Sequence, residues 1–244
     1  MHELLDLGQT LLLCGAEINR VEDTMTRLGR AYGAHSVDIF VITSDIVLTI
    51  QFPDGSELTQ TRRINQPSST DFSKLEQLNA LSRACCQSPL PLDELHTRIH
   101  AIADGQKPEM LLYLGSVLGA GAFAVFFGGS ILDGAAAALM GLLVCFLQQR
   151  VLPVFRNAAV FQFLTALLVG CIICLAVRPL GMLHRDKILI GVIMLLIPGV
   201  AITNSARDML VGHTVSGLLR LTESLLMAGA LALGFGAAIS LLGV

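Results

Sequence analysis

The chain has 244 residues, of which 53% are hydrophobic and 14% are charged, and its mean hydropathy is +0.69. This apolar fraction exceeds that of ordinary soluble domains, so we expect a membrane protein. A net charge of -3 without a basic run gives no support to a nucleic-acid-binding function.

The charged residues are unevenly distributed. Residues 1–110 contain nine Lys/Arg and fifteen Asp/Glu, whereas residues 111–244 contain seven and four. The acidic N-terminus lacks the basic region of a secretory signal. We therefore predict a cytosolic α+β domain over residues 1–107 and an all-α transmembrane domain over residues 108–244, joined by a linker at 104–108.

A long amphipathic helix is predicted at the start of the chain. Apolar residues between Leu4 and Leu28 recur at alternating spacings of three and four, the period of one helical face. Gly8, Gly15 and Gly29 lie beside this stripe, where a missing side chain would let another backbone come close.

A three-stranded antiparallel meander is predicted next. The apolar spacing changes to two over residues 37–41 and again over residues 46–52. A Pro-Asp-Gly turn at residues 53–55 then leads into a more polar strand at 57–64, which we expect at the edge of the sheet.

Two further helices are expected over residues 71–86 and 92–103. His96 and His100 are four residues apart on the second helix, so they share a face and can in principle hold a metal ion. Because no third ligand lies near them in the sequence, we favour a solvated helix face and assign no metal ligands. No catalytic constellation stands out, so we expect neither an enzyme nor a cofactor.

About five transmembrane helices are predicted in the second half. A helix needs about 20 apolar residues to cross the hydrocarbon layer. The second and fourth segments are short for this purpose, so the odd number of spans depends on them. The segments cover residues 110–128, 131–147, 160–177, 188–203 and 218–242.

Polar groups at membrane depth are the first candidates for a transport role, because hydrocarbon offers them no partners. Asp133 can face a pore or simply begin the second segment. Glu223 can take up a proton during coupling, or pair with Arg220 three residues earlier.

The fourth segment contains a predicted break. Pro198 lacks an N–H and its ring clashes with the preceding turn, while Gly199 eases a bend. A broken membrane helix exposes main-chain groups that a transporter can use to hold a ligand, although a packing kink is equally compatible with the sequence.

A polar group of residues follows the break. Asn204 and Asp208 are four residues apart, and Arg207 lies one turn from Asn204. An arginine can hold a carboxylate through two hydrogen bonds, which would suit an organic anion. The alternative is that Arg207 and Asp208 mark the end of the helix at the interface.

Two parts of the sequence resemble signatures of the threonine/serine exporter (ThrE) family. The first is Gly15-Ala16 with Arg20-Val21-Glu22, and the second is Ile197-Pro198-Gly199 followed by Asn204, Asp208 and Gly212-His213. The size matches the larger subunit of the two-component members, typified by a succinate exporter. The resemblance implies a cytosolic domain, about five spans and a separate small membrane subunit. It makes Glu17, Arg20, Glu22, Pro198, Gly199, Asn204, Asp208 and Gly212 candidate functional residues.

The leading hypothesis is therefore a secondary exporter subunit in the bacterial inner membrane, with its N-terminal domain in the cytoplasm. Succinate is the favoured substrate, and threonine or serine is the alternative. Expected partners are the small membrane subunit, the substrate and the lipid bilayer, together with possible copies of the same chain. A membrane-anchored sensor or scaffold is a competing hypothesis, in which the first domain binds a cytosolic protein.

Overall fold

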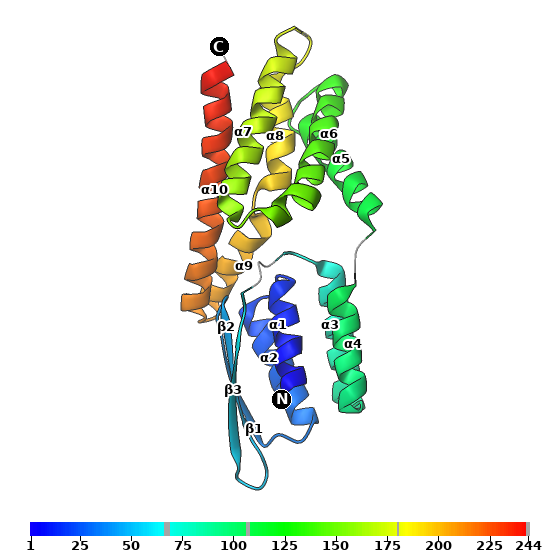
Figure 1. Cartoon of the computed structure of the whole chain (residues 1–244), viewed down its shortest axis with the longest axis vertical. Helices are drawn as coiled ribbons and strands as arrows, with labels where there is room; N and C mark the ends of the chain where they lie inside the picture. The colour runs from blue at the N-terminus through cyan, green and yellow to red at the C-terminus, as the bar shows by residue number, and fades with distance from the viewer. Residues whose placement is uncertain (66–68, 106–107, 180, 243–244) are drawn as a thin grey trace. The chain divides into compact units, whose positions relative to one another are not determined.

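The computed structural model describes residues 1–65, 69–105, 108–179 and 181–242 (Figure 1). These residues form two compact units. The first comprises Met1–Gln106 and Val200–Thr222, and the second comprises Lys107–Gly199 and Glu223–Val244. The predicted linker at 104–108 includes residues 106 and 107, which lie outside the described residues.

The first unit contains helices and a small sheet. Figure 1 shows β1, β2 and β3 beside α1 and α2. Residues 200–222, which sequence analysis assigned to the membrane half, also belong to this unit. Its elements are α1 (His2–Leu13), α2 (Ile18–Ala31), β1 (Ser36–Val41), β2 (Asp45–Gln51), β3 (Glu57–Arg63), α3 (Phe72–Gln87), α4 (Leu92–Asp104), most of α9 (Gly199–Leu210) and the start of α10 (Thr214–Leu242).

The prediction of one long N-terminal helix is wrong, because the chain forms two helices separated by residues 14–17. Gly15 adopts a φ of +85°, which ends a right-handed helix and favours glycine. Its N–H donates to Leu12 O, and the next N–H donates from Ala16 to Leu11 O, as in a Schellman C-cap. The apolar spacing continues across the break because both helices face one core, so spacing alone cannot reveal it.

The antiparallel meander is confirmed. The strand order is β1-β2-β3, and Leu48 of β2 lies opposite Ile39 on one side and Gln60 on the other. Ile46, Leu48 and Ile50 are buried, whereas β3 is mostly exposed and forms a sheet edge, as predicted.

The core of the first unit lies where α1, α2 and the sheet meet. Fully buried side chains include Leu11, Met25 and Leu48. Each contributes roughly 1.5–3 kcal/mol by leaving water. A Cβ at Gly8 would lie 2.4 Å from the Met25 sulfur, so this glycine does permit close packing, as its position beside the stripe predicts.

The second unit is helical. Among the described residues, four helices are long and apolar enough to cross a membrane, and the number becomes five if α8 and α9 together form one broken span. This agrees with the predicted number. Its elements are α5 (Glu109–Phe126), α6 (Ile131–Phe146), the π-helical turn η1 (Leu147–Val151), the 3-10 turn η2 (Leu152–Val154), α7 (Ala158–Val177), α8 (Arg185–Leu196) and the remainder of α10.

Small residues allow close helix packing in the second unit. A Cβ at Gly141 of α6 would lie 2.6 Å from Ser116 O of α5, and one at Gly191 of α8 would lie 2.5 Å from Ala120 O. Backbone contact of this kind is typical of membrane helices, which lack a hydrophobic drive toward one another. Large apolar side chains such as Leu118, Leu139 and Leu233 remain exposed, as a lipid-facing surface requires.

The predicted break at Pro198 and Gly199 is confirmed, because α8 ends at Leu196 and α9 begins at Gly199. The break frees the Leu196 carbonyl, which accepts a hydrogen bond of 2.9 Å from Gln162 Nε2 of α7. With 12 residues, α8 is about 18 Å long and cannot cross a hydrocarbon layer of about 30 Å alone.

Candidate functional site

The candidate site lies in the first unit, where α9 and the start of α10 meet the connection between α1 and α2. The turn between α9 and α10 depends on Gly212, whose φ is +107°. Its N–H donates to Met209 O, and His213 N donates to Asp208 O, which together form a Schellman C-cap. Gly212 therefore has a structural reason to be glycine. Ser216 then donates from Oγ to Val41 O of β1 at 2.9 Å.

Asp208 is the central residue of the site and is only 1% exposed. Its Oδ1 accepts the Ile18 N–H at 3.1 Å, and its Oδ2 accepts Arg220 Nη1 at 3.0 Å. Ile18 is the first residue of α2, where unpaired N–H groups and the helix dipole favour a negative charge. A carboxylate 190 positions away in the sequence thus caps α2.

The main-chain carbonyls after α1 are also bound from α9 and α10. Asn204 Nδ2 donates to Gly15 O at 3.1 Å, and Arg220 Nη2 donates to Ala16 O at 3.2 Å. The left-handed conformation of Gly15 ends α1 at this point, so these carbonyls need partners outside the helix. The main-chain carbonyls of Gly15 and Ala16 therefore bind polar side chains of α9 and α10.

An exposed ion pair lies at the edge of this cluster. Arg207 Nη1 donates to Glu17 Oε1 at 2.7 Å, and their side chains are 66% and 23% exposed. Among the described residues, Arg207 makes its hydrogen bond through Nη1 and none through Nε or Nη2. The other nitrogens can face solvent or a ligand.

Glu22 pairs with His213, whose Nε2 lies 3.7 Å from Glu22 Oε2. Burial raises the pKa of Glu22, and the His213 imidazole partly opposes this rise. The pair links α2 to the turn after α9. It also gives the cluster an ionisable carboxyl group, that of Glu22.

A pocket of about 260 Å³ lies beside the cluster, within the first unit. Arg20 reaches Asn79 across it, with Nε 3.3 Å from Oδ1. Its lining includes two cations, two anions and two amides: Arg20, Arg83, Glu17, Glu76, Asn79 and Asn204.

Asp133 occupies a separate place, at the start of α6 in the second unit. Ser130 N and Oγ both donate to Asp133 Oδ2 at 2.7 Å, and the Asp133 N–H donates to Ser130 Oγ, which makes a capping box. His184 N donates to Oδ1 at 2.7 Å, and His184 Nδ1 lies 2.9 Å from Oδ2. These contacts support the interpretation of Asp133 as a helix start.

The predicted residues therefore fall into several groups. Glu17, Asn204, Arg207 and Asp208 come together, and Glu22 lies in the same cluster through His213. Arg20 lines the neighbouring pocket. Pro198 and Gly199 form the helix break, and Glu223 is exposed on α10 in the second unit.

Sequence reasoning missed the central role of Arg220, which it considered only as a partner for Glu223. The signal that could have found it is a charged residue at the start of a long apolar run, where an unpaired cation would be costly. Ser216 carries no such signal in the sequence.

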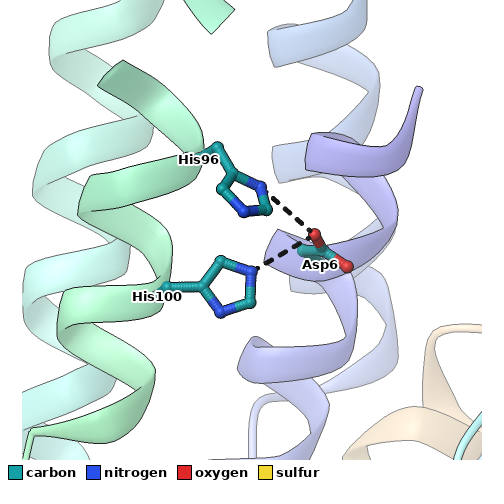
Figure 2. Close-up of side chains that lie close together, drawn as sticks. All are labelled: Asp6, His96 and His100. Atoms are coloured by element: carbon teal, nitrogen blue, oxygen red, sulfur yellow. Dashed lines mark ion pairs between the residues drawn. The ribbon is translucent and has the colours of Figure 1, made fainter. Parts of the chain in front are cut away.

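A second cluster concerns the two histidines of α4. Asp6 of α1 lies beside them and adds the third possible ligand that the local sequence lacks (Figure 2). The expectation that no third ligand is near them is therefore wrong, because Asp6 is distant in the sequence but close in the folded chain.

Comparisons with known proteins identify the family of the chain. A family model described as "Putative threonine/serine exporter" (ThrE) matches residues 3–242. A Klebsiella aerogenes protein named "Probable succinate transporter subunit YjjP" is 28% identical over 236 residues, which cover 96% of this chain and 90% of that protein. No solved structure matches the chain. This multi-pass membrane protein belongs to the threonine/serine exporter (ThrE) family.

Proposed function

We propose that the chain is the larger subunit of a two-component exporter of a small carboxylate, with succinate as the favoured substrate. The similarity to the succinate transporter subunit of Klebsiella aerogenes along nearly its full length carries this proposal. The word subunit in that name favours a second protein, for which we propose a small membrane subunit of the same family. We place the complex in the bacterial inner membrane, with residues 1–107 in the cytoplasm.

The chemistry of the two arginines supports a carboxylate substrate. Arg220 is 12% exposed and bonds Asp208 and Ala16 O, so it serves the protein itself. Arg207 is exposed and uses Nη1 for Glu17, which leaves an edge with Nε and Nη2. A guanidinium edge of this kind can bind a carboxylate through two hydrogen bonds. We assign Arg207 as the first contact of the substrate.

Threonine or serine is the second candidate substrate, and the pocket beside the cluster favours it. Two cations and two anions line that pocket, which suits a zwitterion better than a dianion. Its volume of about 260 Å³ lies below the range of roughly 300–1,000 Å³ for drug-sized ligands, as a small metabolite requires.

The test is a transport assay in inside-out membrane vesicles that contain this chain and the proposed small membrane subunit. Labelled succinate and labelled threonine are added outside, and their uptake is measured with and without a proton gradient. We expect gradient-dependent uptake of succinate. Uptake of threonine alone would favour an amino-acid exporter over a succinate exporter. A lack of gradient-dependent uptake of both compounds would contradict the exporter proposal.

A further inference from the structure

Two helices of the first unit bring three possible metal ligands together. Asp6 lies on α1, and His96 and His100 lie one turn apart on the facing side of α4, with their ring centroids 4.3 Å apart (Figure 2). His96 Nδ1 lies 3.8 Å from Asp6 Oδ2, and His100 Nε2 lies 3.6 Å from the same oxygen. The three ligand atoms all lie within 4.8 Å of one another.

The two Asp6 to histidine separations are close to those of a tetrahedral zinc site. Zinc binds nitrogen and carboxylate oxygen at about 2.0–2.2 Å, and tetrahedral angles then place the ligand atoms about 3.3 Å apart. The Asp6 to histidine distances exceed that value by a few tenths of an ångström. Small rotations of the exposed imidazoles are enough to close the difference.

The surroundings orient the carboxylate. Arg62 Nη1 donates to Asp6 Oδ1 at 2.7 Å and to Gln9 Oε1 at 3.0 Å, so Oδ1 is held away from the histidines. The Asp6 side chain is 15% exposed, while those of His96 and His100 are about half exposed. Oriented carboxylates of this kind are typical of metal sites, where outer hydrogen bonds fix the ligands.

We propose that Asp6, His96 and His100 bind one divalent transition-metal ion, with zinc as the best match, and leave a further coordination position open to water. Imidazole and carboxylate ligands suit Zn²⁺, and the ion would join α1 to α4. The Arg62 guanidinium repels a cation, so we expect it to weaken metal binding. This inference is independent of the exported substrate.

The experiment measures zinc binding to the full chain in detergent micelles by isothermal titration calorimetry, after treatment with a chelator. All proteins carry Cys86→Ser, because this exposed thiol can itself bind zinc. The test variants are His100→Ala, His96→Ala/His100→Ala and Asp6→Asn, and the matched control is His35→Ala, which removes an exposed histidine elsewhere. Circular dichroism without metal confirms that each variant folds.

We expect one zinc ion to bind the parent protein and the control with equal affinity. Loss of one ligand should weaken binding at least tenfold, and loss of both histidines should abolish the transition. Cobalt added in place of zinc should show the absorption of a tetrahedral nitrogen and oxygen site. Absence of binding to the parent, or equal binding to the folded double-histidine variant, would overturn the proposal.

Discussion

Asp133 and Asp208 are both buried carboxylates, yet their hydrogen-bond partners differ in kind. Asp133 is inaccessible to solvent and bonds Ser130, three residues earlier, and His184, which precedes α8. Asp208 bonds the start of α2, 190 positions away, and the guanidinium of Arg220. The first carboxylate completes a helix cap and also bonds His184, 51 positions away, whereas the second pairs with a cation and caps a helix 190 positions away.

This difference shows which buried charge the fold depends on more strongly. The partners of Asp133 in these contacts include main-chain N–H groups and a hydroxyl, so its removal leaves unpaired donors. Removal of Asp208 takes a carboxylate from the largely buried guanidinium of Arg220 and the cap from the first turn of α2. Loss of a charged partner at a largely buried site costs more than loss of neutral hydrogen bonds.

The largest expected effect is therefore that of Asp208→Ala. We expect a loss of about 3–5 kcal/mol in the free energy of unfolding, because Arg220 stays buried without its carboxylate. Reversible denaturation in mixed micelles measures it. The double variant Asp208→Leu/Arg220→Leu should recover a large part of this loss. A loss equal to the sum of those of Asp208→Leu and Arg220→Leu alone would contradict the assigned pair.

A smaller loss is expected for Asp133→Ala, about 1–3 kcal/mol, because the capping box and the hydrogen bonds to His184 disappear together. The same denaturation measurement applies. Ser130→Ala should reproduce only part of the effect, since the carboxylate keeps His184. A loss as large as that of Asp208→Ala would remove the distinction between the two sites.

Arg207→Ala should change stability by only about 0.2–1 kcal/mol, the usual range for an exposed ion pair. Arg27→Ala is the matched control, because Arg27 forms an exposed pair with Asp23 at 2.8 Å in α2. Melting temperatures of both variants close to that of the parent are the expected result. A large drop for Arg207→Ala alone would make this residue part of the structural cluster.

The smallest effect concerns pH. Because burial raises the pKa of Glu22, its carboxylate opposes folding, and this cost appears as the pH rises through the interval between its unfolded and folded pKa values. Glu22→Gln should therefore gain stability relative to the parent as the pH rises above about 4.5, the ordinary pKa of a glutamate. Melting temperatures at several pH values test this, and a difference that does not change with pH would contradict it.

Much of the fold follows from local sequence signals. The alternation of residues 37–41 and 46–52 predicts the meander, and the apolar segments predict the number of membrane helices. Pro198 and Gly199 predict the break, because a proline disrupts the helical turn that precedes it whatever the rest of the fold. The break at Gly15 escaped prediction, since its cause is a backbone angle that the apolar spacing does not record.

The candidate site was only partly predictable. Asn204, Arg207 and Asp208 are neighbours in the sequence, so their grouping on α9 could be predicted. Their partners at Gly15, Glu17 and Ile18 are about 190 residues away, and one sequence contains no signal for such a contact. The same reason explains why Asp6 was not expected beside His96 and His100.

The most direct test of the proposed substrate contact is gradient-driven succinate uptake by Arg207→Ala in vesicles with the small subunit. Loss of two charge-assisted hydrogen bonds should lower uptake at least tenfold at low substrate concentration, while Arg27→Ala keeps the parental rate. We expect this drop together with an unchanged melting temperature. Parental uptake by Arg207→Ala would contradict it.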